Sequence, residues 1–280
     1  MRTILYSEIV ENIKEMCIEA NCHLNTDICD GLKAARESEV SKNGISVLSQ
    51  IIENAQIAAD EKMPICQDTG MVIAFLKIGQ DVHVEGGLLE DAVNEGVRQG
   101  YETGYMRKSV VGDPLLRVNT KDNTPAVVYY EIVAGEEFEI CIMPKGFGSE
   151  NMGGVCMLKP SQGVEGVIDF VVNTVNNAGP NPCPPIVVGV GIGGTMDKAA
   201  VLSKKALMRD IDTHNDDKYI AELENILLEK INELGIGPAG LGGKNTALGV
   251  NVETYPTHIA GLPVAVTISC HVTRHVSRKI

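Results

Sequence analysis

The sequence predicts an α/β protein, more closely an α+β layered fold in which mixed sheets are flanked by helices. Two observations support this class. Apolar residues recur at helical spacing through about residues 1–63, and strand-like runs then alternate with helical patterns over about residues 64–280. Because 280 residues can bury a full core, we expect a single domain over 1–280, with a mostly helical N-terminal portion and an α/β portion after it.

Three helices are expected in the N-terminal portion. The second covers roughly residues 25–35 and the third roughly residues 44–61. Cys17, Cys22 and Cys29 fall within the first two helical patterns without any metal-ligand spacing, so we interpret them as small buried apolar residues. The first helix is predicted by an apolar stripe made of Ile9, Ile13, Met16, Cys17 and Ala20.

The elements after residue 63 alternate between strands and helices. Two β-rich runs, 126–133 and 137–143, are separated only by Ala-Gly-Glu and therefore predict a β-hairpin. Thr195 is expected to cap a helix that follows the buried strand 186–190. The other expected elements are strands at about 71–78, 247–253 and 262–269, and helices at about 87–101, 164–177, 199–208 and 218–234.

Composition narrows the class of function. The net charge of −13 argues against nucleic-acid binding, which needs clustered Lys and Arg, but a few local cations could still hold a small anionic substrate. No twenty-residue apolar run or charged-then-apolar leader is present, so we expect a soluble, cytoplasmic protein with no membrane partner. Eight cysteines at irregular spacing do not resemble a secreted disulfide scaffold, and we expect them to be thiols.

The segment Pro-Ile-Cys-Gln-Asp-Thr-Gly at residues 64–70 carries the densest chemistry in the chain. It offers a thiolate, an amide, a carboxylate and a hydroxyl in a loop between a helix and a strand, and catalytic groups collect on such loops. The same letters also fit a plain connection, in which proline ends the helix and glycine permits the turn.

A second loop, residues 144–154, carries four glycines and Lys145. Such a loop can bring backbone N–H groups close to an anion, with the lysine adding charge. It matches neither GxGxxG nor GxxxxGK[ST], so a nucleotide fold is not indicated. Arg107 lies in a separate basic segment, where it is either a solvated surface charge or a fork on a carboxylate.

Three cysteines differ from the other five. Cys66, Cys183 and Cys270 each lie at the edge of an expected element, in loops rich in Pro, Gly or polar residues. Three thiolates could hold an iron–sulfur cluster with one iron open to act as a Lewis acid. They could equally bind zinc, or Cys66 could be a nucleophile paired with His258 or His271.

Four segments together resemble the α subunit of class I, iron–sulfur-dependent fumarate hydratases, a group that includes the L(+)-tartrate dehydratase α subunit. They are the Cys-Gln-Asp-Thr-Gly loop at 66–70, Lys-Gly-Phe-Gly-Ser-Glu-Asn at 145–151, Cys-Pro-Pro at 183–185 running into the 191–195 turn, and Cys-His at 270–271 with Arg274. The match covers nearly the whole chain in order. It implies a [4Fe-4S] cluster on Cys66, Cys183 and Cys270.

The resemblance also implies the activity and its residues. It implies reversible hydration of fumarate to (S)-malate, a tricarboxylic acid cycle reaction, with tartrate dehydration to oxaloacetate as the alternative and a non-catalytic metal-binding module as a weaker one. Asp68 would transfer a proton on the hydroxyl side, and His258 would bind substrate or orient Asp68. Gln67, Arg107, Lys145 and Gly148 would contact the small dicarboxylate substrate.

The chain departs from single-chain members of that family at its C-terminus. Those members carry a second region with further cations and the expected C3 base, whereas this sequence ends at Ile280, soon after Cys270. The resemblance therefore implies a separate β subunit, in an α2β2 heterotetramer.

Overall fold

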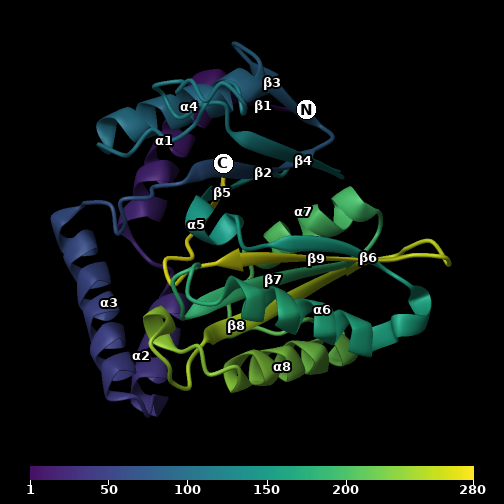
Figure 1. The fold of residues 1–280 in the computed structure, drawn as a ribbon. Helices are drawn as coiled ribbons and strands as arrows, with labels where there is room; N and C mark the ends of the chain where they lie inside the picture. The colour runs from purple at the N-terminus through teal and green to yellow at the C-terminus, as the bar shows by residue number, and fades with distance from the viewer. The chain divides into compact units, whose positions relative to one another are not determined.

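The computed structural model describes residues 1–280, which divide into two compact units (Figure 1). Unit 1 comprises residues 1–24, 54–147 and 274–280, and unit 2 comprises residues 25–53 and 148–273. The expected α/β class with mixed sheets is confirmed. No helix has the length and the apolar run that crossing a bilayer requires.

Unit 1 contains a four-stranded mixed sheet in the order β10-β5-β2-β4. Its inner strand β2 (Met71–Gly79) pairs antiparallel with β5 (Phe138–Lys145) and parallel with β4 (Val127–Val133), and β10 (Val276–Lys279) pairs with the other edge of β5. The helices α1 (Tyr6–Cys22) and α4 (Leu89–Thr103) contribute to the core that packs on this sheet. A short parallel pair, β1 (Arg2–Leu5) with β3 (Val82–Glu85), completes the unit.

The predicted hairpin between the two β-rich runs is wrong, because β2 lies between β4 and β5. The connection between them passes the end of β2 instead, where the Gly79 N–H donates to Glu137 O (2.6 Å) and the Gln80 N–H to Val133 O (2.7 Å). A Cβ on Gly79 would lie 2.3 Å from Gly135 O, so only glycine permits this crossing. A short link that contains glycine can join two adjacent strands of a hairpin or two strands with a third strand between them. The sequence of the link does not distinguish these two arrangements.

Unit 2 is a three-layer arrangement around a second four-stranded sheet, in the order β6-β9-β7-β8. The central strand β7 (Ile186–Gly193) runs parallel to β8 (Ala247–Tyr255) and antiparallel to β9 (Leu262–Ser269), and β6 (Gly154–Leu158) pairs with β9. In Figure 1, α6 (Gly163–Ala178) and α8 (Lys218–Glu233) cover one face, and α7 (Met196–Ala206) covers the other. The remaining helices are α2 (Thr26–Ser38), α3 (Lys42–Glu61), the short α5 (Phe147–Glu150) and single 3₁₀ turns at Pro160–Gln162 and Pro238–Gly240.

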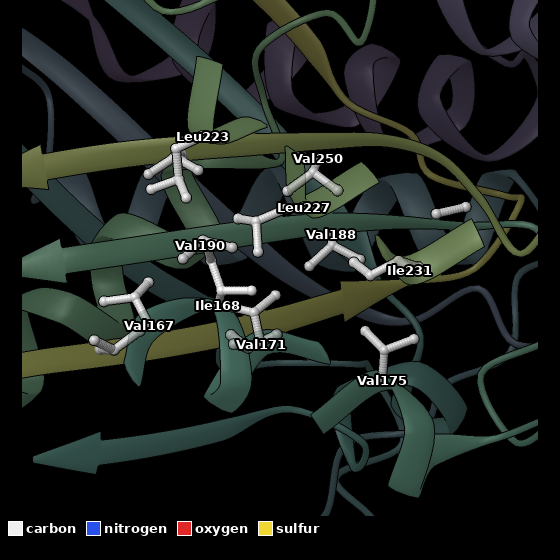
Figure 2. Packing of buried hydrophobic residues seen from close by; sticks show 14 of the residues in the cluster. Val167, Ile168, Val171, Val175, Val188, Val190, Leu223, Leu227, Ile231 and Val250 are labelled. Atoms are coloured by element: carbon white, nitrogen blue, oxygen red, sulfur yellow. The ribbon is translucent and has the colours of Figure 1, made fainter. Parts of the chain in front are cut away.

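The alternation of valine and glycine along β7 fits its two different neighbours. Val188 and Val190 point into the core formed with α6 and α8 (Figure 2). On the opposite face, a Cβ at Gly189 would lie 2.1 Å from Ser203 O, and one at Gly191 would lie 2.0 Å from Ala199 O. The backbone of α7 therefore rests directly on the sheet, which is possible only where side chains are absent.

Most elements with a strong pattern are confirmed, with shifts of a few residues at their ends. The strands that pattern did not predict are β1, β3, β6 and β10, which have only four or five residues each. Thr195 is the N-cap of α7, but its hydroxyl donates to Asp197 Oδ1 (2.5 Å) and not to a backbone group. Cys17 and Cys22 are buried as expected, whereas Cys29 is partly exposed.

Candidate functional site

The loop at residues 66–70 is held at its entrance by two hydrogen bonds within unit 1. The Ile65 N–H donates to Asn21 O (2.9 Å), and the Asn54 side-chain amide donates to Ile65 O (2.9 Å). Ile65 itself is buried. The loop therefore begins from a fixed point between α3 and β2.

The exit of the same loop is held from α4 and from the 105–123 segment. The Tyr101 hydroxyl donates to Thr69 O (2.6 Å) and Gly70 O (3.1 Å), and the Asn123 amide also donates to Gly70 O (3.1 Å). Burial raises the pKa of Tyr101, so its hydroxyl keeps the proton that makes these bonds. Gly70 adopts φ +78°, and a Cβ there would lie 2.7 Å from Lys145 N, so the sequence needs glycine at this turn.

Asp68 is fixed by backbone donors while its carboxylate stays accessible. Its Oδ1 accepts the Gly70 N–H (3.0 Å) and its Oδ2 accepts the Phe147 N–H (2.9 Å). Gly146 passes close by, since a Cβ there would lie 3.2 Å from Asp68 Oδ2. The glycine-rich loop thus does hold an anion with a backbone N–H, and that anion is the Asp68 carboxylate.

Cys66 and Gln67 lie beside Asp68 in the same turn. The Asp68 N–H donates to Cys66 Sγ (3.4 Å), and the Cys66 thiol contacts Gln67 Oε1 (3.6 Å). Cys66 is partly exposed and Gln67 is exposed, so both can meet a ligand.

The other predicted substrate contacts are placed differently from one another. The Thr69 hydroxyl donates to Arg107 O (2.9 Å), so the backbone of Arg107 adjoins the loop while its side chain is exposed. Lys145 is only 2% exposed, and its ammonium donates to Gly146 O (3.1 Å). Gly148 begins unit 2 and is exposed, with nothing within 4 Å of the position of a Cβ.

Cys183 and Cys270 lie at one end of the sheet in unit 2. Cys183 precedes β7 and Cys270 follows β9, and these antiparallel neighbours pair Val187 with Ser269 at that end. His271 joins the two turns, since its Nδ1 lies 2.9 Å from Cys183 O. Burial lowers the pKa of His271, which favours a neutral ring that donates from Nδ1 to this carbonyl.

Glu39 organises the glycine-rich segment at the same sheet end. Its carboxylate accepts five donors, namely the N–H groups of Val40, Ser41, Lys244 and Asn245 and the Asn245 side-chain amide. Burial alone would raise the pKa of Glu39, but the bonds from these donors outweigh it and lower the pKa to about 2. The segment that Glu39 holds reaches the cysteine turn, where the Ala239 N–H donates to Pro184 O (2.8 Å).

His258 lies at the other end of β9 from Cys270. The eight residues of β9 separate them by about 26 Å at the usual rise of a strand. The Thr257 hydroxyl donates to Gly194 O (2.9 Å), which fixes this turn beyond the end of β7. His258 instead lines a hollow of about 430 Å³ with apolar residues that include Val164, Tyr219, Leu223 and Ile259. Within unit 2, the structure therefore does not bring His258 to the two cysteines.

Exposure does not single out the three predicted metal ligands, because Cys29 and Cys156 are partly exposed as well. Cys183 is exposed, Cys66 and Cys270 are partly exposed, and Cys17 and Cys141 are buried. Burial raises the pKa of Cys17 to about 12 and that of Cys141 to about 11, so neither offers a thiolate near neutral pH. No group of three His, Cys, Asp or Glu residues forms a metal-binding arrangement within either unit. Thiolates are the donors that an iron–sulfur cluster prefers, so the three residues suit one chemically. Cys66 belongs to unit 1 and the other two to unit 2, and their joint role as ligands stays a prediction.

Sequence reasoning missed two residues that shape these loops. Arg274 Nη2 donates to Asp68 O (2.7 Å) from 206 positions away, and Glu39 binds residues 205 and 206 positions away. Contacts between residues so far apart in the sequence cannot be predicted from the local spacing of residue types. Arg274 stood within a segment that carries the family resemblance, which was the only available signal for it.

Comparison with known proteins gives concordant matches. The family model described as fumarate hydratase (fumerase) matches residues 10–279. A protein of Methanocaldococcus jannaschii named putative L(+)-tartrate dehydratase subunit alpha is 44% identical over 98% of both chains. Proteins named L(+)-tartrate dehydratase subunit alpha from Escherichia coli are similar too: that of strain UTI89 is 34% identical over 98% of this chain and 90% of its own, and that of strain K12 is 35% identical over 94% and 87%.

Proposed function

This chain belongs to the fumarate hydratase (fumerase) family, and from that premise we propose that it is the α subunit of an iron–sulfur hydro-lyase that dehydrates L(+)-tartrate. The family supports a lyase that removes or adds water. The preference for tartrate over (S)-malate draws on the names of the relatives. Fumarate hydration, the reading that the sequence motifs favoured, is the second candidate because the matching family model bears that name.

The observation that carries the proposal is the arrangement of Cys66, Gln67 and Asp68 in one braced turn. A [4Fe-4S] cluster held by Cys66, Cys183 and Cys270 would supply a Lewis acid for a hydroxyl and an adjacent carboxylate. Asp68 would exchange a proton with that hydroxyl, because each carboxylate oxygen accepts only one backbone N–H and retains a lone pair.

The groups on this turn and in the adjoining segment that contains Arg107 suit a 2-hydroxy dicarboxylate. The exposed Gln67 amide can donate to a substrate oxygen, and the exposed Arg107 guanidinium can fork onto a carboxylate. Lys145 supports the site from within, since its buried ammonium donates to the backbone beside Asp68. The role proposed for Gly148 is a backbone contact to the second carboxylate. His258 is proposed to bind substrate or orient Asp68 at a site other than that of the Cys270 in its own chain, because β9 separates the two residues.

A second subunit is part of the proposal. The relatives are named as alpha subunits, which implies a partner chain, and we propose a β subunit in an α2β2 assembly. Elimination of water by an anti course needs a base on the face opposite the departing hydroxyl. Asp68 is assigned to the hydroxyl side, so the base for the C3 proton is assigned to the partner.

The test is anaerobic reconstitution of the chain with its partner subunit, followed by parallel assays of L(+)-tartrate, (S)-malate and fumarate. We expect turnover of tartrate to exceed that of the other two, and no turnover by the chain alone. A kcat/KM for malate or fumarate above that for tartrate would establish the second candidate. Activity of the isolated chain equal to that of the complex would refute the shared site.

The cluster ligands are tested separately by iron content. Cys183→Ser should abolish iron binding and the visible absorption of the cluster, because serine is a poor ligand for iron in such clusters. Cys17→Ser is the matched control, since Cys17 is buried in α1 and should leave iron content unchanged. Full retention of iron by the Cys183→Ser protein would remove Cys183 from the ligand set.

A further inference from the structure

Arg274 carries a buried charge that has no counter-ion in the structure. The residue is 4% exposed, and its guanidinium makes one hydrogen bond, from Nη2 to the backbone oxygen of Asp68 (2.7 Å). Its Nε is buried and has no acceptor. A guanidinium offers five N–H donors, and a buried charge is normally paired and fully hydrogen-bonded. Arg274 therefore departs from what a purely structural arginine requires.

Arg209 shows how the same chain treats an arginine with a structural role. Its guanidinium pairs with Glu224, which is 2% exposed, and with Glu253 (3.2 Å), and it also donates to Thr213 O (3.1 Å). The positive charge is thus compensated within the protein. No such carboxylate is paired with Arg274.

The charge on Arg274 acts on the groups around the 66–70 loop. Burial raises the pKa of Tyr101 and of Cys22, and the Arg274 charge opposes that rise at both residues. Tyr101 is the residue that donates to Thr69 O and Gly70 O, so it braces the same loop. The guanidinium therefore adjoins the turn that carries Cys66 and Asp68, with its Nη2 on the backbone oxygen of Asp68.

We propose that Arg274 is an electrostatic positioning residue, which compensates negative charge that gathers on the Cys66–Asp68 turn when the site is loaded. This inference rests on the proposed function. The charge has two possible sources, the Cys66 thiolate with the group that it binds, or the carboxylates of the substrate. In the chain without bound metal or substrate, Arg274 is an uncompensated cation that lowers the free energy of unfolding. Binding of the anionic group compensates the charge and removes this destabilisation.

The first arm of the test measures stability of the full chain without metal. Arg274→Met keeps most of the apolar volume and removes the charge, so we expect a Tm equal to that of the wild type or higher by roughly 2–6 °C. Arg209→Met is the matched control and should lower the Tm, because it removes the arginine that pairs with the buried Glu224 carboxylate. An Arg274→Met Tm that falls as far as that of Arg209→Met would overturn the proposal.

The second arm measures loading. If the thiolate and its bound group are the source of charge, Arg274→Met should lose more than half of the iron that the wild-type chain takes up, while Arg274→Lys retains most of it. If the substrate is the source, iron content stays normal and the KM for tartrate rises at least fivefold with a smaller change in kcat. Normal iron content together with a normal KM in Arg274→Met would overturn the proposal.

The two proposals fail in different ways. A wild-type chain that takes up no iron under anaerobic reconstitution would refute the iron–sulfur assignment whatever the variants do. In that case the Tm of Arg274→Met tests the proposal for Arg274 by itself. A Tm at or above that of the wild type would support an uncompensated cation at position 274, and a Tm that falls as far as that of Arg209→Met would overturn the proposal.

Discussion

Replacing Glu39 with glutamine removes one buried charge and leaves the shape of the side chain. Glu39 is 6% exposed and holds the segment that precedes β8 through the N–H groups of Lys244 and Asn245. The pKa of Glu39 is lowered from 4.5 to about 2 in the folded state. The ionised carboxylate is therefore more stable in the folded protein than in the unfolded chain, and it contributes to the free energy of unfolding. Glu39→Gln should therefore destabilise the fold at neutral pH.

The size of the effect follows from that shift. A fall of the pKa from 4.5 to about 2 corresponds to ~3 kcal/mol of unfolding free energy at full value. Glutamine keeps one side-chain oxygen that can accept part of these hydrogen bonds, so we expect the loss to be roughly 1–2 kcal/mol. The contribution is fully present above the unfolded pKa of 4.5 and is lost as the pH falls toward about 2, because protonation then removes the charge that the five donors stabilise.

The assay is urea unfolding of wild type and Glu39→Gln at pH 7, 5, 4 and 3.5. We expect a gap of roughly 1–2 kcal/mol at pH 7 and 5 that narrows at the two lower pH values. Glu37→Gln is the matched control, since Glu37 is exposed two residues away and its replacement should change stability by less than ~0.5 kcal/mol. A gap that stays constant from pH 7 to 3.5, or no gap at all, would refute the assignment of the effect to the Glu39 charge.

Two further outcomes are expected. Asp68→Asn should keep its iron and lose roughly 10²- to 10⁴-fold in kcat, measured in the reconstituted complex, because the amide cannot transfer the proton; a near-normal rate would reassign Asp68 to structure. Gly191→Ala should lower the unfolding free energy by about 1–3 kcal/mol in urea titrations, because its Cβ would lie 2.0 Å from Ala199 O. Gly112→Ala, whose Cβ would have its nearest neighbour at 3.7 Å, should change stability far less, and equal losses in the two variants would contradict the packing of α7 on β7.

The local spacing of apolar residues predicted the helices and strands that face a single core. The buried strand at 186–190 and the helix at 164–177 were found because their residues face one consistent core, as β7 and α6 do in Figure 2. Pairing between strands was not found. The β-rich runs that became β4 and β5 carry no information about β2, whose insertion depends on the parallel register of Ile73 with Val127 and on a glycine at position 79.

In the candidate site too, residues close together in the sequence could be predicted, and contacts between distant residues could not. The turn at 66–70 was identified from its own residues, and in the structure the Cys66 sulfur contacts Gln67 Oε1 and accepts the Asp68 N–H. The residues that brace it, Tyr101 and Arg274, could not be identified from that segment, because they approach from positions 31 and 206 residues away. The reactive side chains could be identified from the sequence, whereas the contacts that hold them in place depend on the fold.

Asp68 and Glu39 show how one functional group can serve two different purposes in this chain. Both carboxylates accept backbone N–H groups from their own turn and from a loop distant in sequence. Glu39 accepts five donors and is 6% exposed, so its acceptor capacity is filled and protonation would break the arrangement. Asp68 accepts two donors and is partly exposed, so about half of its acceptor capacity remains for a proton or a ligand. The unused lone pairs of Asp68, on the turn that also carries Cys66, make it the candidate for proton transfer.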